Sequence, residues 1–135
     1  MGSSPLRVIG GGIAGFVVFN ISLMVMEGVA SSQSPMPAGL DMADEAAMRA
    51  WVATLPSSVF VLVMVGWALG SVLGGLTARL IARRPEPAIV VGVLGTAAAI
   101  VNNLSIPGPT WMWGGLLLFL PGAMAGDRMG RLRAN

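Results

Sequence analysis

The chain has 135 residues, of which 55% are hydrophobic and only 10% are charged. Soluble domains carry about 25% charged residues, so this composition excludes an ordinary water-soluble domain and predicts one small domain in a bilayer. The sequence contains no Cys, His or Tyr, which excludes disulfides, thiolate metal sites and the commonest general base. All eight basic residues are Arg, and they lie beside apolar runs, which argues against nucleic-acid binding.

The first apolar run, residues 8–26, is uncharged over its whole length. A membrane-spanning helix needs roughly 20 such residues. The apolar core of a signal peptide has only about 7–15 residues, so we expect this run to remain in the membrane. It is the first predicted span.

Residues 27–56 form the one long polar segment and are the predicted outer loop. Pro35 and Pro37 block a helix there, and Asp41 is the expected N-cap of a short helix over residues 42–54. The apolar side of this helix would carry Met48, Trp51, Val52 and Leu55. Such an amphipathic helix is expected to lie on the membrane surface.

Three further apolar runs follow the loop, at residues 57–81, 88–104 and 110–126. The connections between them are short and rich in proline, which favours antiparallel hairpins. Pro121 is expected to kink the last run. Together the runs predict an all-α membrane protein, with four transmembrane helices in an antiparallel bundle that forms a single transmembrane domain over residues 1–135.

Arginine is distributed unevenly between the two sides of the predicted bundle. One side holds Arg7, Arg79, Arg83, Arg84, Arg128, Arg131 and Arg133. The loops on the other side hold only Arg49, while Trp111 and Trp113 begin the fourth run there. Positive charge stays cytoplasmic, and indoles prefer the interface. We therefore expect a multi-pass protein of the bacterial inner (cytoplasmic) membrane with both termini in the cytoplasm.

Small residues recur at spacings that place them on one face of a helix. Because apolar burial does not drive association in lipid, such faces let helix backbones approach closely. The positions expected to pack helices together are Gly11, Gly15, Gly66, Gly70, Gly74, Ala78, Gly122 and Gly126. Most of them fall on the cytoplasmic side, so the bundle should close there and splay outside.

Uncharged polar residues fall mostly on the splayed side. The candidate crevice residues are Asn20, Glu27, Trp67, Asn102 and Asn103. An amide in hydrocarbon is costly unless it is hydrogen-bonded. One interpretation is that Asn20 bonds to Asn102 or Asn103 and holds the bundle together. The other is that these residues form an outward-open polar crevice for a ligand, an ion or a lipid headgroup.

Three motifs together resemble a family of small bacterial four-helix integral membrane proteins to which no function is attached. They are PAGLD at 37–41, GWALGSVLGG at 66–75 and LFLP at 118–121. The resemblance implies the four-helix architecture and no activity. Small multidrug transporters have a carboxylate midway along their first helix, and fluoride channels have a phenylalanine pair in the third span. Both features are missing from this sequence.

Catalytic motifs are absent from the sequence, which contains no nucleotide-binding loop, nucleophile elbow or zinc motif. Asp127 with Arg128 and Arg131 is expected to form a surface ion pair beside the headgroups. We therefore expect a non-enzymatic structural or accessory membrane subunit without a cofactor, which associates with itself or with other membrane protein subunits. The alternatives are a small transporter or channel that uses the crevice, and a protein that binds lipid or pigment.

Overall fold

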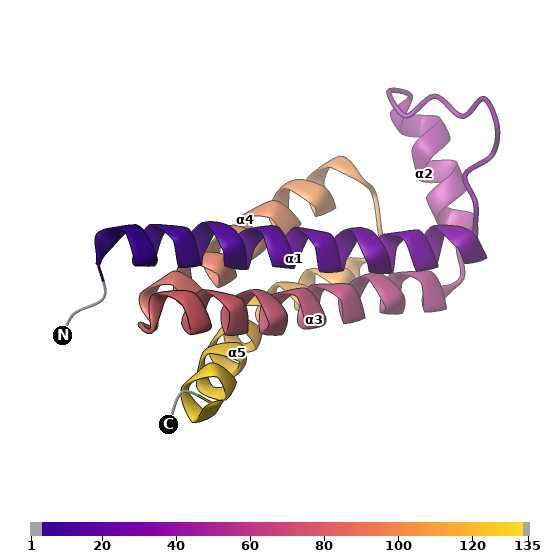
Figure 1. The fold of residues 1–135 in the computed structure, drawn as a ribbon. Helices are drawn as coiled ribbons and strands as arrows, with labels where there is room; N and C mark the ends of the chain where they lie inside the picture. The colour runs from indigo at the N-terminus through magenta and orange to yellow at the C-terminus, as the bar shows by residue number, and fades with distance from the viewer. Residues whose placement is uncertain (1–3, 134–135) are drawn as a thin grey trace.

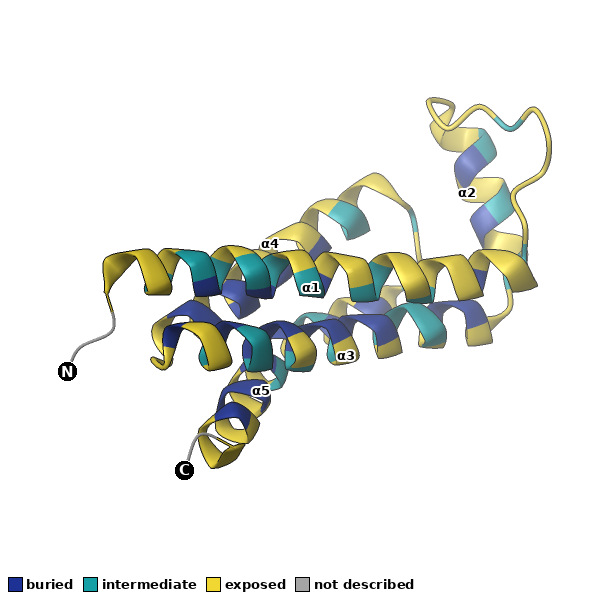
Figure 2. Cartoon of the chain, viewed as in Figure 1, coloured by how far each residue is buried: buried dark blue, intermediate teal, exposed yellow. Residues whose placement is uncertain are grey.

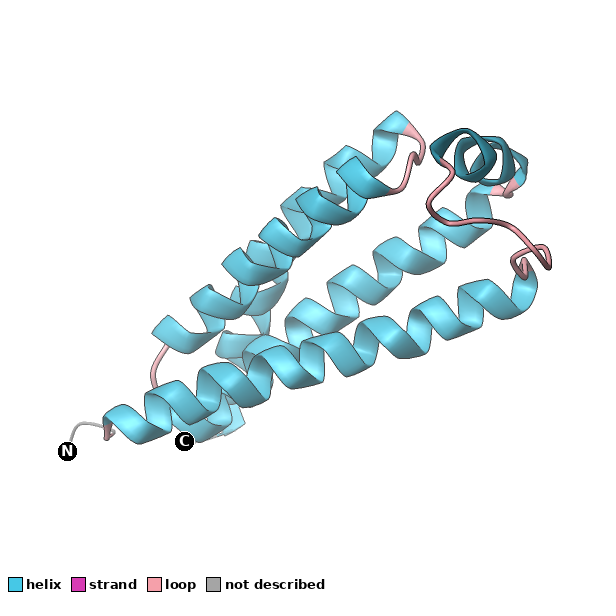
Figure 3. Ribbon diagram, turned by 90° about the horizontal axis from the view of Figure 1, so that it is seen from above, coloured by secondary structure: helices cyan, strands magenta, loops and turns pink. Residues whose placement is uncertain are grey.

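The computed structural model describes residues 4–133, which form helices and connecting loops (Figure 1). In chain order the elements are α1 (Pro5–Gln33), α2 (Glu45–Thr54), α3 (Ser57–Ala82), α4 (Glu86–Ser105), the 3₁₀-helix η1 (Thr110–Leu118) and α5 (Phe119–Arg133). The predicted all-α class is confirmed. Both ends of the described chain lie at the same end of the molecule, and α2 lies at the other (Figure 3).

Three of these helices, α1, α3 and α4, are long and apolar enough to cross a membrane. Their outer surfaces are exposed and apolar: Ile9, Ile13 and Val17 on α1 are each at least half exposed (Figure 2). A soluble protein rarely exposes a continuous apolar surface of this kind. Three candidate spans indicate a multi-pass membrane protein.

The first helix is longer than the predicted span at residues 8–26. α1 continues past Glu27 to Gln33, so Glu27 lies within the helix and does not end it. The helix stops at Ser34 because Pro35 disfavours the helical conformation of the residue before it. At about 1.5 Å per residue, the 29 residues of α1 exceed the thickness of the hydrocarbon core of a bilayer, which is about 30 Å.

The run at residues 110–126, predicted as one kinked helix, is divided into two elements. Thr110–Leu118 is a 3₁₀-helix, and α5 begins at Phe119. Pro121 lies in the first turn of α5, where its missing N–H is tolerated, but it cannot bond to a carbonyl of the preceding turn. Gly115 lies against α3, where a Cβ would lie 2.8 Å from the Trp67 ring. The run is therefore not one continuous membrane-length helix.

The predicted amphipathic helix is present as α2, but it begins later than predicted. Asp44, not Asp41, is the N-cap, and its Oδ1 accepts hydrogen bonds from the N–H groups of Ala46 and Ala47 at 3.0 and 3.1 Å. The Asp41 carboxylate instead accepts a bond from Ala43 N–H in the preceding turn. Met48 and Val52 are buried against the bundle. Burying its apolar face against protein places α2 over one end of the bundle (Figure 3).

The arginine end, defined by Arg7, Arg79, Arg83, Arg84, Arg128, Arg131 and Arg133, is where backbones approach most closely. A Cβ on Gly15 would lie 2.6 Å from the Gly74 carbonyl oxygen, and one on Gly11 would lie 2.9 Å from that of Ala78. On the other side of α3, a Cβ on Gly126 would collide with the Val72 backbone. Only glycine fits at such positions.

The remaining predicted packing residues also lie at helix–helix contacts. Gly70 faces Phe19 of α1, Gly66 faces Met26, and a Cβ on Gly122 would lie 2.8 Å from the Ser71 Cβ. Ala78 is completely buried. Along α3, the contacts therefore pass from backbone against backbone near the arginine end to backbone against long side chains near α2.

Aromatic rings fill the middle of the bundle. The Phe119 ring centroid lies 5.9 Å from that of Phe19 and 5.2 Å from that of Trp67. All three side chains are almost fully buried. These rings separate the glycine contacts of the arginine end from the α2 end, where helices spread apart around a cavity.

Candidate functional site

A cavity of about 370 Å³ lies at the α2 end of the bundle. We call it the α2 pocket. It is bounded by the last turns of α1, by α2, by the first turns of α3 and by residues 102–112, which include the end of α4. The helices diverge at this end, and α2 lies across the opening (Figure 3). The pocket exists because the long side chains there hold the helices apart, whereas glycines let them meet at the other end.

The polar groups of the α2 pocket come from two helices. Glu27, Ser31 and Ser34 line it from α1 and its end, and Asn102 and Asn103 line it from α4. Glu27 is exposed, and it forms no ion pair with any residue in 4–133. The pocket therefore has one carboxylate at its rim, with amide and hydroxyl groups beside it.

The Asn103 side chain has an unmet hydrogen-bonding requirement. Its Nδ2 is buried and has no hydrogen-bond partner among the described residues. Leaving a buried donor unpaired costs about 1–3 kcal/mol. A group of this kind in the wall of a cavity is suited to bonding a molecule that enters the cavity.

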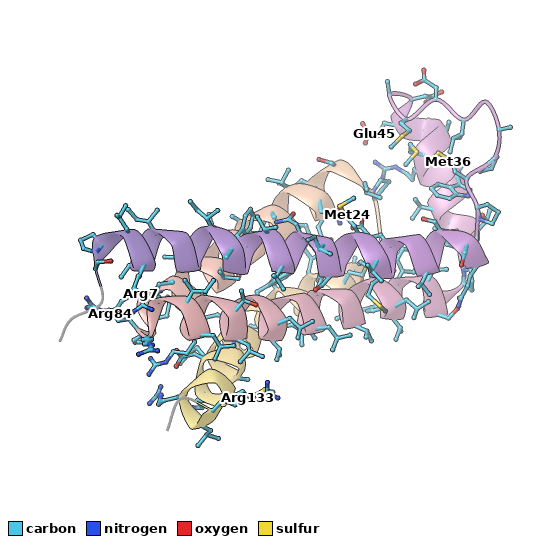
Figure 4. All side chains as sticks on the ribbon, viewed as in Figure 1. Arg7, Met24, Met36, Glu45, Arg84 and Arg133 are labelled. Atoms are coloured by element: carbon cyan, nitrogen blue, oxygen red, sulfur yellow. The ribbon has the colours of Figure 1, made fainter. Side chains whose placement is uncertain are left out.

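The rest of the lining is apolar and adaptable. Four methionines line the pocket, together with Trp51 and Phe60: Met36, Met42, Met48 and Met112. Figure 4 shows Met36 beside α2, whereas Met24 of α1 points away from the bundle. Methionine is flexible and polarizable, so a lining rich in methionine adjusts to ligands of different shape.

The structure brings together three of the five predicted crevice residues, namely Glu27, Asn102 and Asn103, but not Asn20 or Trp67. Asn20 is exposed, and its Nδ2 donates to the Phe16 carbonyl oxygen of its own helix at 2.8 Å. The predicted bond from Asn20 to Asn102 or Asn103 is wrong, because the amide satisfies itself locally. Trp67 is buried in the aromatic core and does not line the pocket.

A second polar site, at the arginine end, differs from its predicted form. Asp127 is only 5% exposed, so the carboxylate of the predicted surface pair is buried, whereas the Arg131 side chain is 55% exposed. Its Oδ2 accepts a bond from Arg131 at 2.8 Å, and its Oδ1 lies 3.5 Å from Arg79 Nη1 of α3. Arg128 does not take part in this cluster. The two arginines match the buried negative charge and tie α5 to α3.

Sequence reasoning missed the burial of Asp127, although a signal for it was present. Asp127 lies four residues after Ala123 and three before Gly130, so it shares their helix face. Both of these small residues are buried against α3. A carboxylate on a close-packed face has to be buried, and a buried charge requires a partner. Arg79 of α3 is that partner.

The usual metal-ligating side chains do not cluster within residues 4–133. These residues contain no group of three or more His, Cys, Asp or Glu side chains that could hold an ion. The Asp127 cluster contains a single carboxylate between two arginines, an arrangement that repels cations. The α2 pocket, with one carboxylate and mostly apolar walls, is suited to holding an organic molecule.

Comparison with known proteins identifies no family for this chain. No protein-family model, curated protein or solved structure matches the chain. The function of the chain therefore has to be inferred from its own geometry.

Proposed function

We propose that this chain is a non-enzymatic, multi-pass protein of the bacterial inner membrane that binds an amphipathic molecule in the α2 pocket, on the outer side. The α2 pocket carries the proposal: it combines an apolar lining, one rim carboxylate and an unpaired buried amide. Ligand sites are typically concave and mostly apolar, with a few convergent polar groups. A lone Glu27 beside Trp51 and Phe60 favours a cationic group on the ligand.

The proposal includes a fourth membrane crossing made of η1 and the first half of α5. A 3₁₀-helix rises about 2.0 Å per residue and an α-helix about 1.5 Å. Residues 110–126 divided in this way extend about 30 Å, which is the thickness of the hydrocarbon core. They have no charged side chain, and Asp127 follows them directly.

The orientation follows from charge. Arg7, Arg84 and Arg133 lie at one end of the molecule and Glu45 lies at the other (Figure 4). Because arginine-rich ends stay cytoplasmic, the α2 pocket faces outward. Cysteine introduced at Ser32 should react with an impermeant thiol reagent in intact cells, and cysteine at Glu86 should not. Labelling at both positions would contradict a single orientation.

Ligand binding is tested with tetraphenylphosphonium, an apolar cation, added to the protein in lipid nanodiscs, with empty nanodiscs as the blank. We expect saturable binding by the wild type and weaker binding by Glu27→Gln. Val52→Trp, which fills the pocket, should abolish binding. Glu45→Gln is the matched control, because that carboxylate is on α2 but outside the pocket. Equal binding by Val52→Trp and wild type would overturn the proposal.

A flux measurement distinguishes a carrier from a protein that only binds its ligand. Ion and proton carriers usually keep an ionisable group inside a span, and residues 8–26, 57–78 and 88–126 have none. We therefore expect liposomes containing the protein to show no flux of small ions or cationic dyes. Flux that Val52→Trp abolishes would identify the pocket as part of a transport route.

A structural or accessory subunit is the second candidate, and a groove between α1 and α4 favours it. This groove has a volume of about 410 Å³ and is lined mainly by apolar side chains, including Ile13, Val17 and Leu94. Most of the small residues described above already contact another helix of the same chain. They are therefore not available to bind a partner. Native mass spectrometry of gently solubilised protein would report copy number and partner chains. A strictly monomeric species would count against the accessory role.

A further inference from the structure

Two adjoining cavities lie at the arginine end, remote from the α2 pocket. One, of about 170 Å³, is bounded by the start of α4 and by Asp127, Arg128 and Arg131 of α5. The other, of about 430 Å³, is lined by Leu120, Pro121, Met124, Ala125 and Arg128. Met124 and Arg128 belong to both cavities, so a polar recess leads directly into an apolar groove.

The geometry points to a binding site for an anionic phospholipid, with the phosphate in the recess and an acyl chain in the groove. Pro121 and Arg128 are seven residues apart, which places them on one face of α5 about 10 Å from each other. The groove therefore extends from the end of the uncharged segment toward its middle. A phospholipid likewise has its charged phosphate at the membrane surface and its acyl chain toward the middle of the bilayer.

The charge of the recess suits a phosphate. Asp127 is one wall, but its carboxylate is engaged by Arg79 and Arg131. Arg131 donates to Asp127 through one nitrogen and keeps further N–H donors, because a guanidinium has five. Arg128 is exposed and forms no ion pair with the rest of the described chain. A phosphate in the recess could therefore bind Arg128, which has no ion pair, and the remaining N–H groups of Arg131.

The start of α4 completes the recess. Pro85, Ala88 and Ile89 line it from α4 and the turn before α4. Basic pockets between membrane helices on the cytoplasmic side are typical positions for anionic headgroups. The recess belongs to this class, and the site does not depend on any ligand of the α2 pocket.

The test is a lipid titration followed by native mass spectrometry of the full chain in mild detergent. The probes are dioleoyl phosphatidylglycerol and, as the zwitterionic reference, dioleoyl phosphatidylcholine. We expect the wild type to prefer phosphatidylglycerol, and Arg128→Gln to lower that affinity about fivefold, the amount typical of one arginine near an anionic lipid. Arg133→Gln is the matched control, since Arg133 is on the same helix but outside both cavities.

A second variant tests the groove without changing charge. Ala125→Trp should fill the groove and weaken binding of both lipids, while the exposed position of Ala125 keeps the fold intact. Equal effects of Arg128→Gln and Arg133→Gln would show diffuse charge attraction and would overturn the site. Equal binding of the two lipids by the wild type would also overturn the site. Displacement of phosphatidylglycerol by millimolar inorganic phosphate would identify a free-anion site instead.

Discussion

The two ends of this bundle are built from the same helices but differ in how close the helices come. At the arginine end, α1 and α3 meet through Gly11, Gly15 and Gly74, with backbone against backbone. At the α2 end, the same two helices carry long side chains and border a cavity. Side-chain size, read along two helices, therefore decides where the molecule is closed and where it is open.

The polar groups follow the same division. The buried charge of Asp127 is fully matched at the closed end, where α5 is tied to α3. The amide of Asn103 at the open end is buried without a partner. A closed end with satisfied groups provides stability, whereas an open end with an unsatisfied group is suited to binding. Native proteins often accept a local loss of stability at functional sites.

The largest expected effect is the loss of close packing at the arginine end. Gly15→Ala would place a Cβ 2.6 Å from the Gly74 carbonyl oxygen, so α1 has to move away from α3. Overpacking of this kind costs about 3 kcal/mol of unfolding free energy. Denaturation in a mixed-micelle titration would measure it. Gly10→Ala is the matched control, because no atom lies within 4 Å of its Cβ, and an equal loss in both variants would contradict the packing argument.

The next effect concerns the buried charge. Asp127→Asn leaves Arg79 and Arg131 without their carboxylate and should lower the unfolding free energy by about 2 kcal/mol. Glu45→Gln removes a similar i,i+4 pair with Arg49, but both side chains there are exposed. Exposed pairs of this kind contribute about 0.5 kcal/mol or less. Thermal unfolding of both variants in one lipid composition compares the two ends. Equal losses of unfolding free energy in the two variants would show that the burial of Asp127 adds nothing to the stability of its ion pair.

The sequence was sufficient to predict the closed end, because small residues at a spacing of four have one clear physical use in lipid. The predicted packing positions at this end, including Gly11 and Gly126, lie at helix–helix contacts. Hydropathy also located α3 to within a residue of its ends. Both predictions depend on local composition and periodicity, which a single sequence contains.

The open end was only partly predictable, because it depends on how distant segments meet. Glu27, Asn102 and Asn103 were identified by polarity and depth, but Asn20 was not excluded, because its bond to Phe16 depends on its rotamer. The methionines of α2 and its preceding loop were not recognised as a lining, since only the docking of α2 brings them to the pocket.

The unpaired amide provides the third prediction. Asn103→Leu removes a buried donor without a partner, so the empty protein should gain about 1 kcal/mol of unfolding free energy. Tetraphenylphosphonium has no hydrogen-bond acceptor, so the same variant should bind it as tightly as the wild type does. Asn20→Leu is the control: it removes an amide that bonds within its own helix and lies outside the pocket, so binding should not change. If only Asn20→Leu weakened binding, the ligand would have to bind outside the α2 pocket.

The smallest expected effect concerns the turn that joins α3 to α4 at the arginine end. Arg83 caps α3 with a φ of 57°, a left-handed conformation that glycine adopts more easily. Relief of that strain amounts to about 1 kcal/mol. Part of this gain is lost, because glycine also increases the entropy of the unfolded chain. Arg83→Gly should therefore raise the unfolding free energy by only about 0.5 kcal/mol.

Thermal unfolding in the same micelles would measure this gain, with Arg84→Gly as the control. Arg84 is next in the chain and lacks the positive φ, so glycine there relieves no strain. It also breaks the exposed pair with Glu86 and should be neutral or slightly destabilising. If Arg83→Gly destabilised the protein instead, the Arg83 side chain would have to stabilise the closed end by more than its backbone strain costs. The arginine end would then depend on charge as well as on glycine packing.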